Sequence, residues 1–141
     1  MSAAITPAIL IKLQTYLRKA FVSQALSVRA RPKKSDVAEV FVNDEPLGLI
    51  TIDDEDGDVT YQFAWTIKEK PQPISLQELL RIQTYLRERL VSKTLAVRGR
   101  GKLKDSAEVF VGDDSLALIS FSKDSYDFNM AILDIDLDDI V

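Results

Sequence analysis

Two short strings of this sequence occur twice at the same spacing, and that repetition limits the fold more than any other feature. The string Gln-Thr-Tyr-Leu-Arg at 14–18 returns 69 positions later at 83–87. The string Ala-Glu-Val-Phe-Val at 38–42 returns at 107–111, again 69 positions later. A shared offset indicates a duplicated unit, which has to be recognised before a fold is assigned. We therefore divide the chain into two repeats, residues 1–70 and residues 71–141.

The composition predicts a globular protein whose two repeats share one core. Of the 141 residues, 46% are hydrophobic and 28% are charged, which is far from the composition of a disordered chain. A domain the size of one repeat buries only about 60% of its unfolded surface and is marginally stable alone. We expect the two small units to bury surface against each other.

Residue types that are missing from the sequence narrow the chemistry. The chain has no cysteine and no histidine, which excludes disulfides, thiol nucleophiles, imidazole bases and Cys/His zinc sites. No signal-like start and no uncharged stretch of membrane-spanning length is present, so we expect a cytoplasmic protein without a membrane partner. The net charge of −4 disfavours tight, sequence-independent binding to nucleic acid. No cofactor is expected.

Each repeat is predicted to open with an amphipathic helix. Thr6 and Ser75 are good N-cap residues; Pro7 follows the first, and Ser75 with Glu78 has the spacing of a capping box. The apolar stripes that follow have helical spacing and contain Leu10, Leu13, Leu17 and Phe21 in the first repeat and Leu79, Ile82, Leu86 and Leu90 in the second.

Four strands are predicted after each helix. Alternating or β-rich runs separated by turn residues occupy 26–31, 38–42, 47–52 and 61–67, with counterparts at 95–100, 107–111, 116–121 and 126–132. At the fourth strand the offset falls to 65, because the second repeat has lost four residues from the preceding turn. Such turns tolerate changes in length.

These elements predict an α+β protein of two tandem units, each a helix followed by a four-stranded antiparallel meander (αββββ twice). The third strand is apolar in both of its alternating rows, whereas one helix covers only one face of a sheet. We therefore predict a pseudo-twofold internal dimer in which uncovered sheet faces or edges of the two copies meet.

Several strings resemble a family of small proteins of unknown function found mainly in alphaproteobacteria. They are Tyr-Leu-Arg on the first helix, Arg-Ala-Arg-Pro-Lys-Lys at 29–34, Ala-Glu-Val-Phe-Val, the acidic turn at 53–58 and the ending at 128–137. Members of that family resemble a single copy. The resemblance implies that this chain is a covalent version of a dimer, and it brings no activity, cofactor or catalytic residue.

A basic run is the strongest indication of an anionic partner. Period-two spacing places basic residues on one face of the first strand in each repeat; the run contains Arg29, Arg31, Lys33 and Lys34, and its counterpart contains Arg98, Arg100, Lys102 and Lys104. No aromatic residue is interleaved for base stacking. The pattern therefore favours a solvated strand face balanced by nearby acidic residues, with polyanion binding as the alternative.

Two acidic segments are further candidates. The turn at 53–58 invites a calcium interpretation, but aligning Gly57 with an EF-hand loop places Ile52 and Phe63 at ligand positions, which favours an exposed hairpin tip. The segment containing Asp134, Ile135, Asp136 and Leu137 alternates acidic and apolar residues. It predicts either a sheet-edge strand that completes the fold or a partner-binding tail.

Catalysis has little support in the sequence. No carboxylate, lysine or tyrosine pair stands in an apolar, cleft-like context, and Gly99-Arg100-Gly101-Lys102 lacks the glycines of a phosphate loop. We expect a non-enzymatic module that binds an unidentified protein partner or serves as a scaffold, as a monomer or a homodimer. The alternative is weak binding of nucleic acid or another polyanion through paired basic strands.

Overall fold

Each repeat consists of a helix followed by four strands, as the sequence predicts. The computed structural model describes residues 4–54 and 58–138. The first repeat contains α1 (Pro7–Ala20), β1 (Leu26–Arg31), β2 (Lys34–Val42), β3 (Glu45–Asp53) and β4 (Thr60–Ile67). The second contains α2 (Leu76–Leu90), β5 (Leu95–Arg100), β6 (Leu103–Val111), β7 (Asp114–Phe121), β8 (Tyr126–Leu133) and the short helix α3 (Asp134–Asp138).

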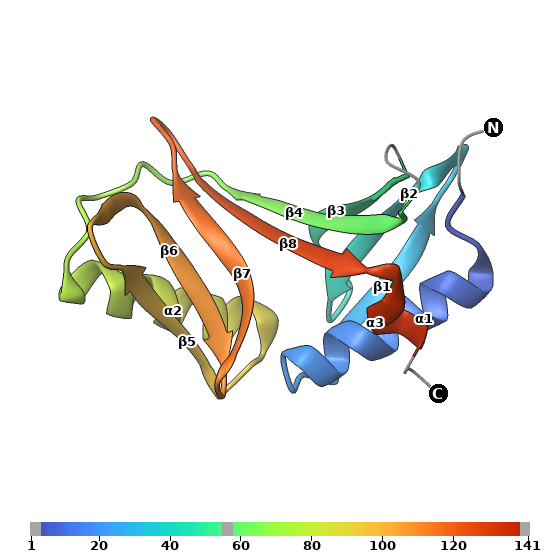
Figure 1. Cartoon of the computed structure of the whole chain (residues 1–141), viewed down its shortest axis with the longest axis horizontal. Helices are drawn as coiled ribbons and strands as arrows, with labels where there is room; N and C mark the ends of the chain where they lie inside the picture. Colours follow the sequence, from blue (N-terminus) through green and yellow to red (C-terminus); the bar gives the residue numbers. More distant parts are fainter. Residues whose placement is uncertain (1–3, 55–57, 139–141) are drawn as a thin grey trace.

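The two repeats form one antiparallel sheet of eight strands in the order β1-β2-β3-β4-β8-β7-β6-β5. The repeats join where β4 pairs with β8, and these two strands run side by side between the halves (Figure 1). Edges of the two copies therefore meet, and faces do not. Both helices lie on the same side of the sheet (Figure 1). None of the described helices is long and apolar enough to span a membrane.

The pairing of β4 with β8 confirms the pseudo-twofold arrangement. Phe63 lies opposite Met130, and Trp65 lies opposite Phe128. Phe128 is the counterpart of Phe63 at the offset of 65, and Met130 is the counterpart of Trp65. A twofold rotation therefore exchanges one pair with the other, which is the relation expected of an isologous dimer interface.

Two serines make a reciprocal contact between the repeats. The Ser23 hydroxyl donates to the backbone oxygen of Leu90 over 2.6 Å, and the Ser92 hydroxyl donates to that of Phe21 over 2.5 Å. Both serines are buried. The last carbonyls of a helix have no partner within it, so each repeat supplies a hydrogen bond to the helix end of the other.

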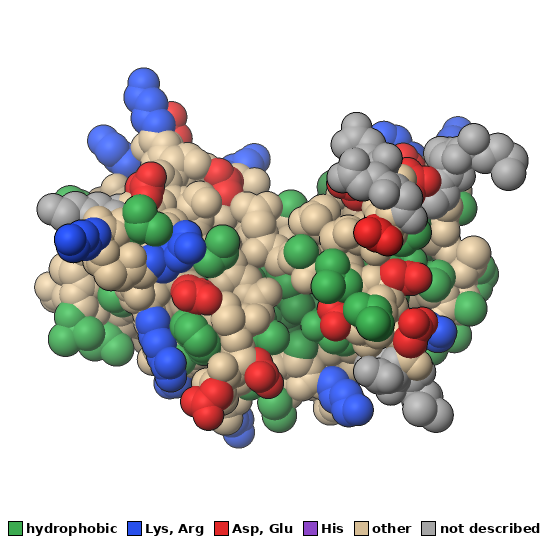
Figure 2. Space-filling view, in the orientation of Figure 1, with side chains coloured by type: hydrophobic (Ala, Val, Ile, Leu, Met, Phe, Trp, Pro, Cys, Tyr) green, Lys and Arg blue, Asp and Glu red, His purple; other side chains and the backbone are tan. Residues whose placement is uncertain are grey.

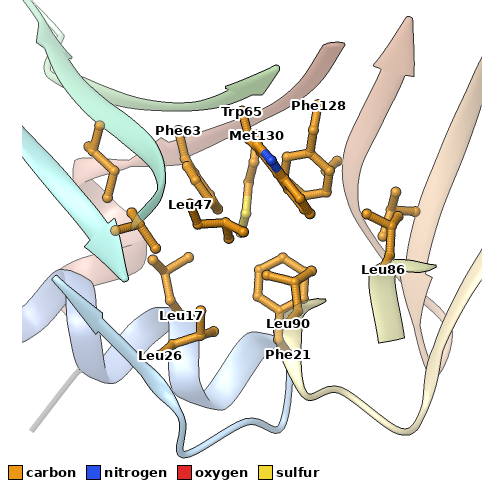
Figure 3. Packing of buried hydrophobic residues seen from close by; sticks show 14 of the residues in the cluster. Leu17, Phe21, Leu26, Leu47, Phe63, Trp65, Leu86, Leu90, Phe128 and Met130 are labelled. Atoms are coloured by element: carbon orange, nitrogen blue, oxygen red, sulfur yellow. The ribbon is translucent and has the colours of Figure 1, made fainter. Parts of the chain in front are cut away.

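The hydrophobic core is shared by both repeats. Phe128, fully buried on β8, has its ring centroid 6.3 Å from that of Phe21, 5.5 Å from Phe63 and 5.6 Å from Trp65. Figure 3 shows these rings together with leucines from both helices in one cluster. All three ring partners of Phe128 belong to the first repeat. The core of the second repeat is therefore completed by the first.

The repeated Gln-Thr-Tyr-Leu-Arg string closes the outer edges of the sheet. The Gln14 side-chain oxygen accepts from the backbone N–H of Val28 over 3.1 Å, and Arg18 Nε donates to the backbone oxygen of Leu26 over 2.6 Å. The second repeat has the same two contacts: the Gln83 side-chain oxygen accepts from the Val97 N–H, and Arg87 Nε donates to the backbone oxygen of Leu95. Because β1 and β5 are edge strands, these side chains satisfy backbone groups that would otherwise be open to another strand.

The predicted helix starts are confirmed. The Thr6 hydroxyl accepts from the Ile9 N–H over 3.2 Å, and the Ser75 hydroxyl accepts from the Glu78 N–H over 3.1 Å. The capping box at Ser75 is only half formed, because the Glu78 carboxylate pairs with Arg81 and Tyr126. The second strand of each repeat begins earlier than predicted, at Lys34 and Leu103.

The outer face of the sheet, opposite the helices, is not covered. The third strands β3 and β7 were expected to be covered on both faces, yet Leu49 is 37% exposed and Leu118 is 38% exposed. The expectation of cover was wrong for this row, because the repeats join through strand edges and bring no second layer over the outer face. Isolated apolar side chains at the surface are normal in soluble proteins.

Candidate functional site

The structure does not bring the two basic runs together. Their arginines lie on β1 and β5, the two outermost strands, with six strands between them, and their lysines lie in the following turns and at the starts of β2 and β6. At about 4.8 Å per strand, the two runs are about 34 Å apart along the sheet. Arg31, Lys33 and Lys102 are exposed. Arg100 is half-buried and donates to the Ser106 hydroxyl over 3.3 Å.

The first arginine of each run stacks on a phenylalanine of the neighbouring strand. The Arg29 guanidinium lies 4.1 Å from the ring centroid of Phe41, and that of Arg98 lies 4.4 Å from Phe110. Arg29 also pairs with Asp44 over 2.5 Å. The rings are diagonal cross-strand neighbours, two positions beyond the paired Glu39 and Glu108, so a search for aromatic residues within the basic run does not find them.

The acidic turn lies partly outside the described residues. Positions 55–57, which include Gly57, are in that undescribed part, so the calcium interpretation of 53–58 stays a prediction. In the segments 4–54 and 58–138, no three acidic side chains gather closely enough to hold a metal ion.

The predicted tail is a short helix, α3, and the expectation of a strand was wrong. Leu133 is the last residue of β8 to pair with β4, whose own strand starts at Thr60. One further backbone bond, from the Asp134 N–H to the Val59 oxygen over 3.2 Å, follows that pair before the chain turns into α3. The Asp136 carboxylate accepts from the Leu133 N–H over 3.0 Å, and Leu137 is buried. Asp134 and Ile135 are exposed. The helix lies beside α1 of the first repeat (Figure 1).

The end of each long helix meets the opposite repeat, and one of these two junctions is filled by large side chains. There Arg89 of α2 pairs with Glu45 over 2.9 Å, and its guanidinium lies 5.9 Å from the ring centroid of Trp65. Trp65 stacks on Tyr85 with 6.1 Å between centroids. We call this arrangement of Glu45, Trp65, Tyr85 and Arg89 the closed junction.

The equivalent place at the end of α1 is a groove. Ala20 is the counterpart of Arg89, Met130 is the counterpart of Trp65, and Asp114 is the counterpart of Glu45. An open cavity of about 560 Å³ lies here, with Ala20 and Asp114 in its lining. We call it the junction groove; it is lined by Tyr16, Lys19, Ala20, Val22, Val111, Asp114, Ser115, Leu116 and Asp136. Asp136 belongs to the tail segment that the sequence singled out.

Exposure confirms that the two junctions differ. Val111 and Leu116 in the groove are half-buried, whereas their counterparts Val42 and Leu47 are buried. Val22 is 64% exposed, but its counterpart Val91 is only 41% exposed. In Figure 2 a hollow separates the two halves, with apolar side chains in it and acidic side chains beside it.

Val22 also has a strained backbone. It follows the last turn of α1 with φ of 51°, and Val91 follows α2 with the same value. The left-handed conformation costs a residue other than glycine about 1–2 kcal/mol, and it is rare for a β-branched side chain. Here it turns the chain so that the next residue, Ser23 or Ser92, reaches the other repeat.

The junction groove is electrostatically negative on balance. Burial raises the pKa of the Tyr16 hydroxyl, and the charges of Asp136 and Asp114 raise it further. Lys19 is the cation among the lining residues and is exposed. Within the described segments the Asp114 carboxylate forms no hydrogen bond or ion pair, whereas the Glu45 carboxylate at the closed junction pairs with Arg89. The Asp114 side chain is exposed to solvent.

A second polar cluster surrounds Glu78, which is buried although charged. Arg81 donates to both carboxylate oxygens of Glu78, from Nε to Oε1 over 2.6 Å and from Nη2 to Oε2 over 2.9 Å. The Tyr126 hydroxyl donates to the same carboxylate and accepts from the Gln72 N–H over 3.0 Å. Arg81 also pairs with Glu69. This network fastens the segment between the repeats to the start of β8, which is a structural role.

The network shifts the pKa values of Glu78 and Tyr126. The hydrogen bond from Arg81 holds the pKa of the Glu78 carboxyl below its usual value, against the opposing effect of burial, and the bond from Tyr126 lowers it further. Burial raises the pKa of the Tyr126 hydroxyl, and its bond to Glu78 adds to the rise.

We expect Glu78→Gln to lower the free energy of unfolding by about 2 kcal/mol at pH 7, because charge-assisted hydrogen bonds are lost from a buried group. The folded-state pKa of Glu78 is depressed, so its stabilisation is complete above the unfolded value of about 4.3 and is lost as the pH falls through the folded-state pKa. Urea unfolding at pH 7 and pH 3 measures the difference, with Glu88→Gln at an exposed site of α2 as control. A difference that stays constant with pH would contradict this role.

Comparison with known proteins places the chain in a family without assigning a function. No curated protein and no solved structure matches it significantly. A family model described as a protein of unknown function (DUF3126) matches twice, over residues 10–71 and 78–136, once in each repeat. Together these matches cover most of the chain, which therefore belongs to the DUF3126 family as a tandem of two copies.

Proposed function

We propose that this protein is a non-enzymatic interaction module of the bacterial cytoplasm, and that a partner protein docks in the junction groove. One observation carries the proposal. The chain fills one of two equivalent junctions with Trp65 and Arg89 and leaves a groove at the other, where Ala20 stands in the place of Arg89. The groove lacks the contacts that fill the closed junction, and a docked partner would supply them.

The groove has the features of a binding site for part of a protein. Its volume of about 560 Å³ falls within the range of about 300–1,000 Å³ that is typical of ligand pockets. Val22, Val111 and Leu116 give it apolar walls, and Tyr16 and Asp136 give it polar groups that fix the orientation of a bound segment. Exposed apolar surface rimmed by polar residues is typical of interaction sites.

Polyanion binding by the basic strands has less support. The two runs lie at opposite edges of the sheet. The guanidinium groups of Arg29 and Arg98 stack on the rings of Phe41 and Phe110. A polyanion would have to follow the outer face across all eight strands to reach both runs. It would pass exposed Leu49 and Leu118 near the middle of the sheet, which add no positive charge.

Site-specific cross-linking tests the proposed docking, with the two junctions as each other's control. A photoreactive benzoylphenylalanine in place of Val22 should cross-link a partner in cells of the native host. The same residue in place of Val91 should not, although Val91 has the same backbone conformation and is also exposed. Ala20→Arg should abolish the cross-link from position 22, because the new side chain copies Arg89 and fills the groove.

A second variant controls for the added charge. Ala8→Arg places the same side chain at an exposed position near the start of α1 and should leave the cross-link unchanged. Equal cross-linking from positions 22 and 91, or cross-linking from position 22 that survives Ala20→Arg, would refute docking in the groove.

A further inference from the structure

At the closed junction the side chain of Arg89 occupies the place that is open in the junction groove. The Arg89 guanidinium lies over the ring of Trp65 and pairs with Glu45, which belongs to the other repeat. Tyr85 supports the tryptophan from the helix. The pseudo-twofold rotation carries this place onto the junction groove, so the closed junction shows which chemistry this geometry accommodates.

The groove has lost the arginine but keeps groups that would bind one. Asp114 occupies the position of Glu45, and its carboxylate has no hydrogen-bond or ion-pair partner among the described residues. Tyr16 occupies the position of Tyr85 and offers an aromatic ring. Asp136 of α3 adds a second carboxylate, because the helix α3 packs beside α1. Ala20 leaves the space in which the Arg89 side chain would stand.

The charge balance favours a cation. Asp114 and Asp136 outnumber Lys19 among the lining residues. The groove also lies at the C-terminal end of α1, where the helix dipole contributes partial negative charge. An arginine suits such a place better than a lysine, because its planar guanidinium can stack on an aromatic ring and bond to carboxylates at the same time.

We propose that the junction groove binds the guanidinium group of an arginine side chain presented by a partner protein. The arginine would stand where Arg89 stands at the closed junction, with its guanidinium between the carboxylates of Asp114 and Asp136 and beside the ring of Tyr16. This inference rests on the proposed docking function and specifies its chemistry.

Titration of the full chain with short peptides tests the proposal. The probe is a blocked pentapeptide with a central arginine between alanines, compared with its citrulline analogue, which has nearly the same shape without the charge. Backbone amide shifts are measured in the ¹⁵N-labelled protein. We expect shifts confined to residues 16–22, 111–116 and 134–137, which line the groove, with a Kd on the order of 1 mM and citrulline binding at least about fivefold weaker, as the loss of one exposed ion pair and one cation–π contact implies.

Variants of the lining residues sharpen the test. Asp114→Asn should weaken the arginine peptide about fivefold, whereas Asp113→Asn, on the same turn but outside the groove, should have no effect. Lys19→Glu should strengthen binding, because it removes the opposing charge and copies Glu88 of the second repeat. Ala20→Arg should abolish binding. The fold of each variant is checked from its amide spectrum.

The outcomes separate this inference from the proposed function. Equal affinity for arginine and citrulline, or no shift in the groove at about 10 mM peptide, would refute arginine recognition. A cross-link from position 22 that Ala20→Arg abolishes would still support docking in that case. If the arginine peptide binds in the groove but position 22 yields no cross-link, docking of a protein partner fails while the recognition chemistry stands.

Discussion

Replacement of Phe128 by alanine lowers the free energy of unfolding by about 4 kcal/mol, the loss typical of removing a phenylalanine from a packed core. Phe128 is fully buried and contacts three aromatic rings, those of Phe21, Phe63 and Trp65. All three come from the other repeat, so the cavity would open where the two copies join. Domains have total stabilities of only about 5–15 kcal/mol. The substitution is therefore expected to bring the protein close to unfolding.

Phe110→Ala is the matched control for this experiment. It removes the same side chain from the uncovered face of the sheet, where Phe110 is half-buried and contacts the Arg98 guanidinium. We expect a loss of about 1 kcal/mol, made up of partial burial and one cation–π contact. Urea unfolding followed by circular dichroism measures both variants. Similar losses at the two sites would show that the junction between the repeats is not the centre of the core.

The local elements of this fold could be predicted because their signals are local. Thr6 and Ser75 cap their helices as expected, and each of the eight strands overlaps its predicted position, although β2 and β6 begin earlier than predicted. The way in which the copies meet could not be predicted. Phe63 and Trp65 form an apolar row on one side of β4, and such a row fits face-to-face packing as well as a continuous sheet with one covered face.

The junction groove could not be predicted because its residues meet only through the twofold relation. Ala20, Asp114 and Asp136 come from three separate segments of the sequence and belong to no common motif. A position-by-position comparison of the repeats contains the signal, since Ala20 aligns with Arg89 at the offset of 69 and Trp65 aligns with Met130 at the offset of 65. Two large side chains replaced by smaller ones at one junction indicate a cavity once the pairing of the repeats is known.

The tail shows a different limit of sequence patterns. Alternating residues at 134–137 favoured a strand, but a strand needs a neighbour, and the pairing with β4 ends at Thr60, with a single further bond from Asp134 to Val59. Burial of Leu137 then decides the local conformation, and Asp136 bonds to the backbone of Leu133. The same acidic residue that suggested a tail for partner binding lines the junction groove, although in a helical turn.

Residues 74–141 expressed alone are expected to form a homodimer and no stable monomer. Without β4, the strand β8 becomes an open edge, Phe128 loses its three ring partners and Ser92 loses the carbonyl of Phe21. A second copy of β8 can take the place of β4. A twofold pairing would set Met130 of each copy opposite Phe128 of the other, just as Phe63 now lies opposite Met130 and Trp65 opposite Phe128. Melting should therefore rise with concentration, as it does for folding coupled to association.

Sedimentation and melting experiments with residues 1–73 added decide between the two halves as partners. An equimolar mixture should form a heterodimer in preference to either homodimer, because only the mixed pair contains the contacts of Arg89 with Glu45 and of Trp65 with Tyr85. Trp65→Met in the first half, which copies Met130, should reduce that preference by removing the ring that Tyr85 and Arg89 contact. A second half that stays monomeric and melts cooperatively at micromolar concentration would mean that the shared core is not required for folding.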